Sequence, residues 1–347
     1  MYDIAIIGLG PAGATLARLL DKKFKVIAID KKNKKINKCC GGLLAPDAQK
    51  ILAQFDICLP KDVLVNPQIF SVKTIDLNNQ IIKYYQRFYL NMDRNKFDNF
   101  LISLIPNNIE ICSDSICKKI ELKDKIFHFT FMTNKMERTE EAKIIIGADG
   151  GNSIVSNTFY KKNKISKYFS IQEWYKNGIN SPFYSCIFDK NITDSYCWTI
   201  SKDDYFIIGG AFPIKGCNKK FEMLKEKIRN MGITLSELKK REGCFINLNK
   251  GIPNICTGRN GAYLIGEAAG MISPSSLEGI SYSMKSAKIM ADTMNNYYNN
   301  IGYNYFIKSF GIRIQLKLKI LKKLFMFKMF RKLIMKSGIK SIKMGTT

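Results

Sequence analysis

The hydrophobic pattern of the chain is dominated by short apolar runs that lie between polar stretches. Five of these runs each predict one strand, and they cover residues 4–7, 25–29, 109–112, 144–147 and 262–265. An apolar run bounded by turn residues is typical of a strand buried on both faces of a parallel sheet. Helices are expected over residues 12–20 and 95–104. The pattern therefore predicts an α/β domain.

The first apolar run leads into a glycine-rich turn that reads Gly8-Leu9-Gly10-Pro11-Ala12-Gly13. In a G-x-G-x-x-G turn the first glycine permits the tight turn, the second lets the backbone approach a pyrophosphate, and the third lets the helix pack closely on the strand. The N–H groups at the helix N-terminus then face the phosphates. Asp30 ends the next strand, where an acid can hold an adenosine ribose hydroxyl. These residues predict dinucleotide binding.

Two later strand ends also carry glycine-rich turns. Residues 144–153 turn around Asp149, and residues 262–267 end in Gly266 and Glu267. A nicotinamide dinucleotide needs only the first turn. A longer ligand, extended across the sheet from its adenine to a ring system, can use all three turns.

A different pattern, with a period of two, marks a second kind of sheet. Residues 195–213 predict a hairpin with strands over 196–201 and 205–212 and a turn at 202–204. Because side chains two positions apart share a face, Tyr196 and Trp198 are expected to lie together. With Phe183 and Phe188 they would form an apolar floor, unless they are ordinary sheet core.

The net charge of +26 comes from 55 Lys and Arg against 29 Asp and Glu. The excess has two interpretations: attraction to an anionic surface, or a composition rich in Lys, Ile and Asn. Residues 301–347 contain twelve basic residues and no acid. This segment is expected to be helical and to pack through a stripe, with lysines free to touch anionic lipid headgroups. The stripe consists of Ile314, Leu318, Leu321, Phe325 and Met329.

Several kinds of chemistry are excluded by residue usage. His128 is the only histidine, it lies in an alternating strand, and the ten cysteines form no C-x-x-C pair. A zinc site, a Ser-His-Asp triad and a disulfide scaffold are therefore not expected, and a reducing cytoplasm fits. No signal peptide, membrane-spanning run or nucleic-acid-binding motif is apparent.

Long motifs carry a resemblance to a known family across nearly the whole chain. They read GLGPAG (8–13), CGGLLAPDAQ (40–49), MDRNKFD (92–98), IGADG (146–150), SYCWTISKDDYFIIGGAFP (195–213) and LIGEAAG with SSLEGISY (264–282). In these motifs the chain resembles the FAD-dependent geranylgeranyl reductase family, among the p-hydroxybenzoate-hydroxylase-type flavoproteins. Within that group it is most similar to the bacterial CbrA-type oxidoreductases.

The resemblance implies an α/β fold, α+β overall. A Rossmann-like FAD-binding domain of the glutathione-reductase type would carry an inserted antiparallel-sheet substrate domain and a basic helical C-terminal segment. The FAD-binding domain would be discontinuous, with residues 1–65, 90–160 and 250–300. The substrate domain would contain residues 66–89 and 161–249, and the C-terminal segment residues 301–347.

The resemblance also implies which residues hold FAD. Gly266 and Glu267 would hold the ribityl end, although the family usually has Gly-Asp there. A helix after Gly279 and Ile280 would direct its positive N-terminus at the flavin, where it would stabilise the reduced ring. Arg94 would contact FAD.

By the same resemblance, Ser115 or Ile116 would pass near the adenine. Cys40, Gly41 and Gly42 would form the turn beside the flavin ring. There Cys40 would tune the flavin or relay a proton, or it would serve only as a small packing residue. Ser156 stands where the family usually has an arginine, so the electron donor is open between NAD(P)H and a reduced protein.

Three functions are compatible with these residues. The first is reduction of a carbon–carbon double bond in an isoprenoid or similar lipid, by hydride transfer from reduced FAD at the inner membrane face. Tyr196 and Trp198 would line the substrate pocket, with Cys40 as the candidate catalytic residue. The second is aromatic hydroxylation on the same fold. The third is flavin and lipid binding without turnover, in protection of the cell envelope.

Overall fold

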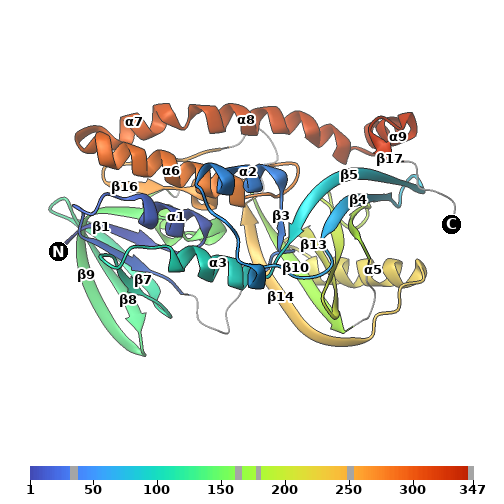
Figure 1. Ribbon diagram of the computed structural model, residues 1–347, viewed down its shortest axis with the longest axis horizontal. Coiled ribbons are helices and arrows are strands. Elements are labelled where there is room, and N and C mark those ends of the chain that lie inside the picture. Colours follow the sequence, from blue (N-terminus) through green and yellow to red (C-terminus); the bar gives the residue numbers. More distant parts are fainter. Residues whose placement is uncertain (32–37, 161–165, 177–180, 248–253, 343–347) are drawn as a thin grey trace. The chain divides into compact units, whose positions relative to one another are not determined.

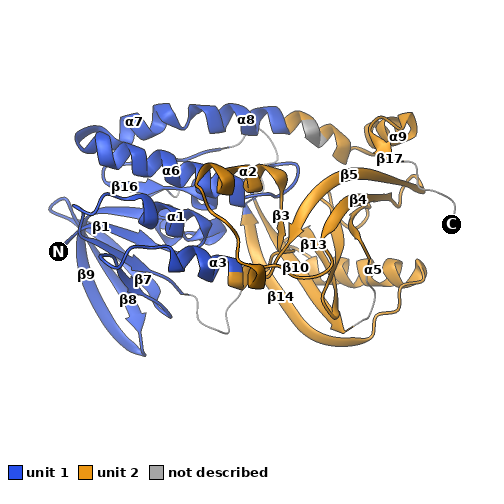
Figure 2. Ribbon diagram, in the orientation of Figure 1, with its two compact units in different colours: residues 1–37, 97–166, 247–319 blue, residues 38–96, 167–246, 320–347 orange. Residues whose placement is uncertain are grey.

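The computed structural model describes residues 1–31, 38–160, 166–176, 181–247 and 254–342 (Figure 1). The chain divides into two compact units, each built from three separate segments (Figure 2). The first unit contains residues 1–37, 97–166 and 247–319, and the second contains residues 38–96, 167–246 and 320–347. The expected domains differ from these units because residues 38–65 and 90–96 pack in the second unit. The expected boundaries at 161 and 250, and residues 343–347, lie outside the described residues.

The first unit is built on a mixed sheet whose central strand is β1 (Tyr2–Ile7). The strand order is β15, β16, β9, β1, β2 and β6, and β1 pairs in parallel with both β2 and β9. β16 also pairs in parallel with β9, so the three strands that lead into glycine turns are neighbours. β8 and β7 follow β9 in antiparallel pairing. The other strands are β2 (Val26–Ile29), β6 (Glu110–Cys112), β7 (Ile116–Lys123), β8 (Ile126–Thr133), β9 (Met136–Gly147), β15 (Gly258–Arg259) and β16 (Ala262–Leu264).

Helices complete the first unit. α1 (Pro11–Leu19) begins at a proline, which suits the first turn of a helix, and packs against α6 (Ile280–Asn296). Seven of the nine residues of α1 are buried, in agreement with its short apolar sequence. The remaining helices are α3 (Arg94–Ser103), whose first three residues belong to the second unit, α4 (Ile154–Phe159), α7 (Ile301–Lys308) and α8 (Phe310–Leu321), which ends in the second unit.

The second unit is built on a largely antiparallel sheet with the order β14, β10, β13, β12, β11, β4, β5 and β17, and β3 pairs with β5. β11 and β4 are parallel to each other. Helix α5 (Cys217–Asn230) packs on one face through Phe221 and Leu224. The strands are β3 (Leu43–Leu44), β4 (Ile69–Asp76), β5 (Ile81–Asn91), β10 (Lys167–Lys176), β11 (Phe183–Phe188), β12 (Cys197–Lys202), β13 (Tyr205–Pro213), β14 (Glu237–Asn247) and β17 (Ser341–Ile342); α2 (Pro46–Gln54) and α9 (Lys328–Ser337) are the other helices. Both sheets together confirm the expected fold class.

The hairpin of β12 and β13 is tighter than the sequence pattern predicts. Lys202 belongs to β12 and pairs with Tyr205, so the turn consists of Asp203 and Asp204 alone. Lys202 is only 3% exposed. Its polar character predicts a turn residue, but the buried acceptors around its ammonium group keep it in the strand.

The predicted packing stripe of the C-terminal segment is wrong. α8 ends at Leu321, and a 3-10 turn separates it from α9. Ile314, Leu318 and Leu321 are 42%, 59% and 65% exposed, and Met329 is 73% exposed. Phe325, another residue of the stripe, packs against Phe188, with their ring centroids 5.3 Å apart. α8 has apolar residues on two opposite faces, and it packs through the other one.

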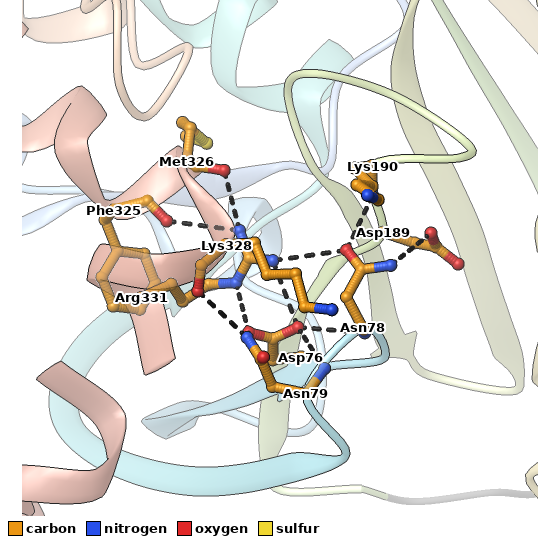
Figure 3. Close-up of polar contacts among 9 residues, drawn as sticks. All are labelled: Asp76, Asn78, Asn79, Asp189, Lys190, Phe325, Met326, Lys328 and Arg331. Carbon is orange, nitrogen blue, oxygen red and sulfur yellow. Dashed lines mark hydrogen bonds and ion pairs between the residues drawn. The ribbon is translucent and has the colours of Figure 1, made fainter. Parts of the chain in front are cut away.

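A buried ion pair attaches α9 to the sheet of the second unit (Figure 3). Arg331 donates from Nε to Asp76 Oδ2 over 2.6 Å and from its second terminal nitrogen to Asp76 Oδ1 over 3.1 Å. The two residues are 2% and 0% exposed. Burial alone would raise the pKa of Asp76, but hydrogen bonds from Arg331 and Asn79 lower it overall. Arg331 also donates to the carbonyl oxygens of Phe325 and Met326, which fixes the preceding turn.

Candidate functional site

The glycine turn after β1 lies against the turn after β9. Gly8 has φ +96°, and a Cβ atom there would lie 2.8 Å from both Ala148 O and Asp149 Cα. A Cβ atom on Gly13 would lie 1.8 Å from Gly8 O, so α1 packs closely on the strand as the spacing predicts. At Gly10 a Cβ atom would meet no described atom within 4 Å. The middle glycine therefore faces open space, which suits the approach of a phosphate.

Asp30 and Ser115 lie together at the end of β2. Asp30 is 6% exposed, and its carboxylate accepts the N–H of Leu9 over 3.3 Å. Its backbone carbonyl accepts the N–H of Ser115 over 2.8 Å. Ser115 is buried and Ile116 is exposed at the start of β7. The acid of the dinucleotide fingerprint is thus held beside the first glycine turn.

The third glycine turn, after β16, contacts the first. Gly266 has φ +57°, and a Cβ atom there would lie 3.1 Å from Ala12 Cβ and 2.9 Å from Ser283 Oγ. Glu267 is 6% exposed and its Oε1 accepts the N–H of Asn247 over 3.1 Å. The side-chain amide of Asn247 donates to Glu267 O over 3.0 Å. Asn247 is a residue that the sequence analysis missed, because nothing in its neighbourhood resembles a motif.

The start of α6 carries its own negative charge. Gly279 is the residue before the helix and Ile280 begins it. The carboxylate of Glu278 accepts the N–H and the hydroxyl of Ser281 over 2.7 and 2.6 Å. The chain therefore already offsets part of the positive charge expected at this helix end.

Asp149 has an unusual carboxylate. Oδ2 accepts the N–H of Ile154 over 2.7 Å, whereas Oδ1 is buried and has no hydrogen-bond partner among the described residues. Burial raises the pKa of Asp149 to about 6, against the opposing hydrogen bonds of Ser153 and Ile154. A buried polar atom without a partner is costly, and it indicates a place for a ligand donor.

Replacing Asp149 with asparagine is expected to stabilise the FAD-free protein at pH 7 by an amount on the order of 2 kcal/mol. The raised pKa means that the native state binds more protons than the unfolded state between pH 3.8 and about 6. The wild type therefore loses stability as pH rises through this window, and the uncharged variant does not. Urea unfolding at pH 4, 5, 6 and 7 measures the difference, which should be near zero at pH 4. A difference that does not change with pH would contradict the assignment.

The Cys40–Gly42 turn of the second unit is held by several polar groups. Cys40 Sγ accepts hydrogen bonds from Arg94 and from the N–H of Gly42, each over 3.4 Å. The amide of Gln172 donates to Cys40 O over 3.2 Å. A Cβ atom on Gly41 would lie 2.7 Å from Ile200. The guanidinium of Arg94, expected to contact FAD, is thus directed at the Cys40 thiol.

Lys202 is a second residue that the sequence analysis did not assign to the site. Its ammonium group donates to Asn91 Oδ1 over 2.6 Å, to Met92 O over 2.7 Å and to Gly42 O over 3.2 Å. Burial lowers its pKa to about 8, although Cys40 and nearby acids oppose the shift. The signal was present, because Lys202 lies within the SYCWTISKDDYFIIGGAFP motif. Its position fixes the Cys40–Gly42 turn to β12.

Aromatic side chains cover the face of the sheet opposite α5. The ring centroids of Tyr196 and Trp198 are 5.9 Å apart, and those of Phe188 and Tyr196 are 6.2 Å apart. Trp198 pairs with Gly209, where a Cβ atom would lie 2.4 Å from the indole nitrogen, so glycine is needed for the indole to lie flat. Trp198 Nε1 is buried without a hydrogen-bond partner among the described residues. We call this group, Phe188, Tyr196 and Trp198 with Tyr184, the aromatic face.

The prediction that Phe183 joins this group is wrong. On β11, Phe183 pairs with Ser71 of β4, and Ile187 pairs with Ile75. Ile187 and Ile75 both belong to the core under α5. Positions 183 and 188 differ by an odd number, so their side chains point to opposite faces of β11. Tyr184, which contacts Tyr89 at 5.6 Å, takes its place. Burial raises the pKa values of Tyr184 and Tyr196, and that of the neighbouring Cys186 to about 12, so these three side chains are neutral at pH 7.

The predicted site residues therefore form two groups. One group lies in the first unit and contains Gly8, Gly10, Pro11, Ala12, Gly13, Asp30, Ser115, Ile116, Asp149, Gly266, Glu267, Gly279 and Ile280. The other lies in the second unit and contains Cys40, Gly41, Gly42, Arg94, Tyr196 and Trp198. Over the described ranges, no helix is long and apolar enough to cross a membrane, and no cluster of three or more His, Cys, Asp or Glu could hold a metal ion.

Solved structures share this fold. A geranylgeranyl bacteriochlorophyll reductase-like protein from Thermoplasma acidophilum superposes with a TM-score of 0.78 at 16% identity, over 96% of this chain and 90% of that one. The myxobacterial chondrochloren halogenase CndH, described as a variant of FAD-dependent halogenases, gives a TM-score of 0.70 at 13% identity, over 94% and 83%. The fold is thus that of the geranylgeranyl reductase-like and hydroxylase-type flavoproteins.

The sequence gives a narrower assignment. No protein-family model matches the chain. Protein CbrA of Escherichia coli O157:H7 is 44% identical over 346 residues, which is 98% of both chains. The CbrA of Shigella sonnei is also 44% identical over 98% of both. At this identity and coverage, the chain belongs to the CbrA family.

Proposed function

We propose that this chain is an FAD-dependent oxidoreductase that reduces carbon–carbon double bonds of an isoprenoid or similar lipid. The observation that carries the proposal is the buried aromatic face of the second unit. Tyr196 and Trp198 are each 7% exposed, so water has little access to these rings, and Phe188, 4% exposed, packs against Phe325. An apolar, dry surface favours a hydrocarbon chain over a charged substrate.

The residues of the first unit fit FAD. Gly10 leaves open space beside α1, and its neighbours Gly8 and Gly13 could not carry a side chain. Asp149 Oδ1 lacks a partner among the described residues and could accept a hydrogen bond from a ligand. Asp30 would hold a ribose hydroxyl beside the turn. When bound and reduced, FAD supplies a hydride.

The chain's own contribution to such a reaction is to orient the substrate and exclude water. The aromatic face would hold the alkene flat against the rings, and the Trp198 N–H would orient a polar atom. Lys202, Gln172 and Arg94 would keep the Cys40–Gly42 turn rigid, because each donates to an atom of that turn. A reduced protein or NAD(P)H would supply the electrons.

Anaerobic photoreduction of the FAD-loaded protein tests the proposal. Addition of a polyprenyl lipid is expected to reoxidise the flavin with loss of one alkene, measured by absorbance and by mass spectrometry of the lipid. Reoxidation only by oxygen, with an oxygenated aromatic product, would show a hydroxylase instead. Tight lipid binding without any reoxidation would show a binding protein that does not turn over its ligand.

The two tryptophans provide a matched pair of variants. Trp198→Leu is expected to slow lipid-dependent reoxidation at least about tenfold, because it removes the ring and N–H that orient the substrate. Trp174→Leu alters a residue whose indole donates to Glu242 over 3.0 Å on another part of the sheet. Its reoxidation rate should stay near that of the wild type. Equal rates in both variants would exclude the aromatic face as the substrate site.

A further inference from the structure

Helices α7 and α8 form one nearly continuous helical rod, which Figure 1 shows in line. Ser309 between them keeps helical backbone angles, with φ −77° and ψ 0°. Its N–H donates to Tyr305 O over 3.0 Å, and its carbonyl accepts the N–H of Arg313 over 3.3 Å. The positions of side chains around the rod can therefore be compared along residues 301–319, which all belong to the first unit.

One side of this rod packs in the first unit. Ile301, Tyr305, Ile312 and Leu316 are at most 4% exposed. The hydroxyl of Tyr305 donates to Leu264 O over 3.1 Å, which ties the rod to the end of β16. The packing of the helix is thus already satisfied by this side.

The opposite side is also apolar, yet it is exposed. It consists of Tyr303, Ile307, Phe310, Ile314 and Leu318, with exposed fractions of 72%, 51%, 58%, 42% and 59%. Their spacing of four, three, four and four residues places them on one stripe of the helix. We call this stripe the outer face. Single exposed apolar residues are ordinary, but a continuous stripe with two aromatic rings marks an interaction surface.

The charges around the outer face indicate what covers it. Residues 301–347 contain twelve basic residues and no acid. Of the basic residues on α7 and α8, Lys317 is exposed beside the outer face. The other three lie over aromatic rings, Lys308 over Tyr297, Arg313 over Phe306 and Lys319 over Tyr282. A second copy of this chain would bring the same positive charges against these, which disfavours self-association. An anionic lipid surface complements them, and long basic side chains can keep their charges in the headgroups while their stems lie on apolar groups.

We propose that the outer face of α7 and α8 inserts into the headgroup region of an anionic lipid bilayer, with the helix axis parallel to the membrane. An exposed apolar stripe on a helix of a basic segment without acids is the pattern of an interfacial helix, which lies on a membrane without crossing it. The proposal differs from contact through lysines alone, because it assigns the binding to the apolar stripe. It does not depend on which reaction the protein catalyses.

Vesicle sedimentation with the full chain tests this surface. Vesicles of phosphatidylcholine with about one third phosphatidylglycerol are expected to pellet the protein, and pure phosphatidylcholine vesicles to pellet at least about tenfold less. Binding to the anionic vesicles should weaken as salt is raised, because the basic residues contribute. Failure to pellet with either vesicle at low salt would overturn the proposal.

Paired variants then separate the outer face from nonspecific attraction. Phe310→Gln combined with Leu318→Gln is expected to weaken binding to anionic vesicles at least about tenfold, with the thermal unfolding temperature unchanged. The control combines Leu122→Gln with Met136→Gln, which removes two exposed apolar side chains from strands of the same unit. The control should bind like the wild type. Equal binding by the wild type, the outer-face variant and the control would overturn the proposal. A wild type that is dimeric, with an outer-face variant that is monomeric, would also overturn it.

A fluorescent probe reports insertion directly. Phe310→Trp places an indole on the outer face, and Met136→Trp places one on β9. Brominated lipids are expected to quench the tryptophan fluorescence of Phe310→Trp when it binds vesicles. The quenching of Met136→Trp should not exceed that of the two native tryptophans. Lack of quenching in a vesicle-bound Phe310→Trp protein would show that the stripe does not insert, and would overturn the proposal.

Discussion

Replacing Gly10 with alanine is expected to weaken FAD binding about a hundredfold and to leave the unfolding of the FAD-free protein unchanged. A Cβ atom at this position meets no described atom within 4 Å, and φ is −68°, which alanine adopts readily. The added methyl group would occupy only the space through which the phosphates approach the backbone. Flavin fluorescence titration measures the affinity, and a thermal melt of the flavin-free protein measures the fold.

Gly13→Ala provides the contrast. Its Cβ atom would lie 1.8 Å from Gly8 O, so the variant is expected to lose both FAD binding and stability of the first unit. The two variants separate ligand contact from backbone packing within one turn. If Gly10→Ala binds FAD like the wild type, the glycine turn does not face the phosphates, and the proposed cofactor site fails.

Replacing Arg331 with methionine is expected to lower the free energy of unfolding by about 3–5 kcal/mol. The substitution leaves the Asp76 carboxylate, 0% exposed, without its bidentate partner, and it removes the donors to two carbonyl oxygens. Urea unfolding monitored by circular dichroism gives the value. The loss should decrease at acid pH, because the isolated carboxylate can then bind a proton.

Removing both charges should cost less than removing one. Asp76→Leu combined with Arg331→Met leaves no buried charge unpaired, so the double variant is expected to be more stable than either single variant. Lys288→Ala is the surface control, because its ion pair with Asp292 is exposed and follows the i,i+4 spacing. It should cost less than about 0.5 kcal/mol. If Arg331→Met lowers the free energy of unfolding by no more than Lys288→Ala does, the buried pair does not hold α9 in place.

Much of the first unit was predictable because its signals are local. The glycine turns after β1, β9 and β16 follow apolar runs directly, and the apolar runs alone indicate parallel strands. That these three strands are neighbours was not predictable from periodicity, since pairing depends on contacts between distant segments. Glu267 shows what a local motif cannot predict. The motif identifies this acid, but not its hydrogen-bond partner Asn247, which lies 20 positions away.

The second unit was predicted less well because its arrangement depends on register and burial. Phe183 was placed on the aromatic face although an odd separation from Phe188 puts it on the other side of β11. The hairpin pattern predicts Lys202 in the turn, whereas three acceptors hold its ammonium group inside. The sequence predicts that the stripe from Ile314 to Met329 packs, but Ile314 and Leu318 are exposed and α8 packs through Ile312 and Leu316. A helix with two apolar stripes does not show in its sequence which one the fold will bury.

The ion pair between Asp76 and Arg331 joins residues that are 255 positions apart. During synthesis, β4 therefore leaves the ribosome long before its partner exists. Until then the Asp76 carboxylate must remain hydrated or bind a proton, and this end of β4 cannot be sealed from water. The second unit is thus completed only after translation has reached α9, and a nascent chain stalled before Arg331 would present an open sheet end to chaperones and proteases.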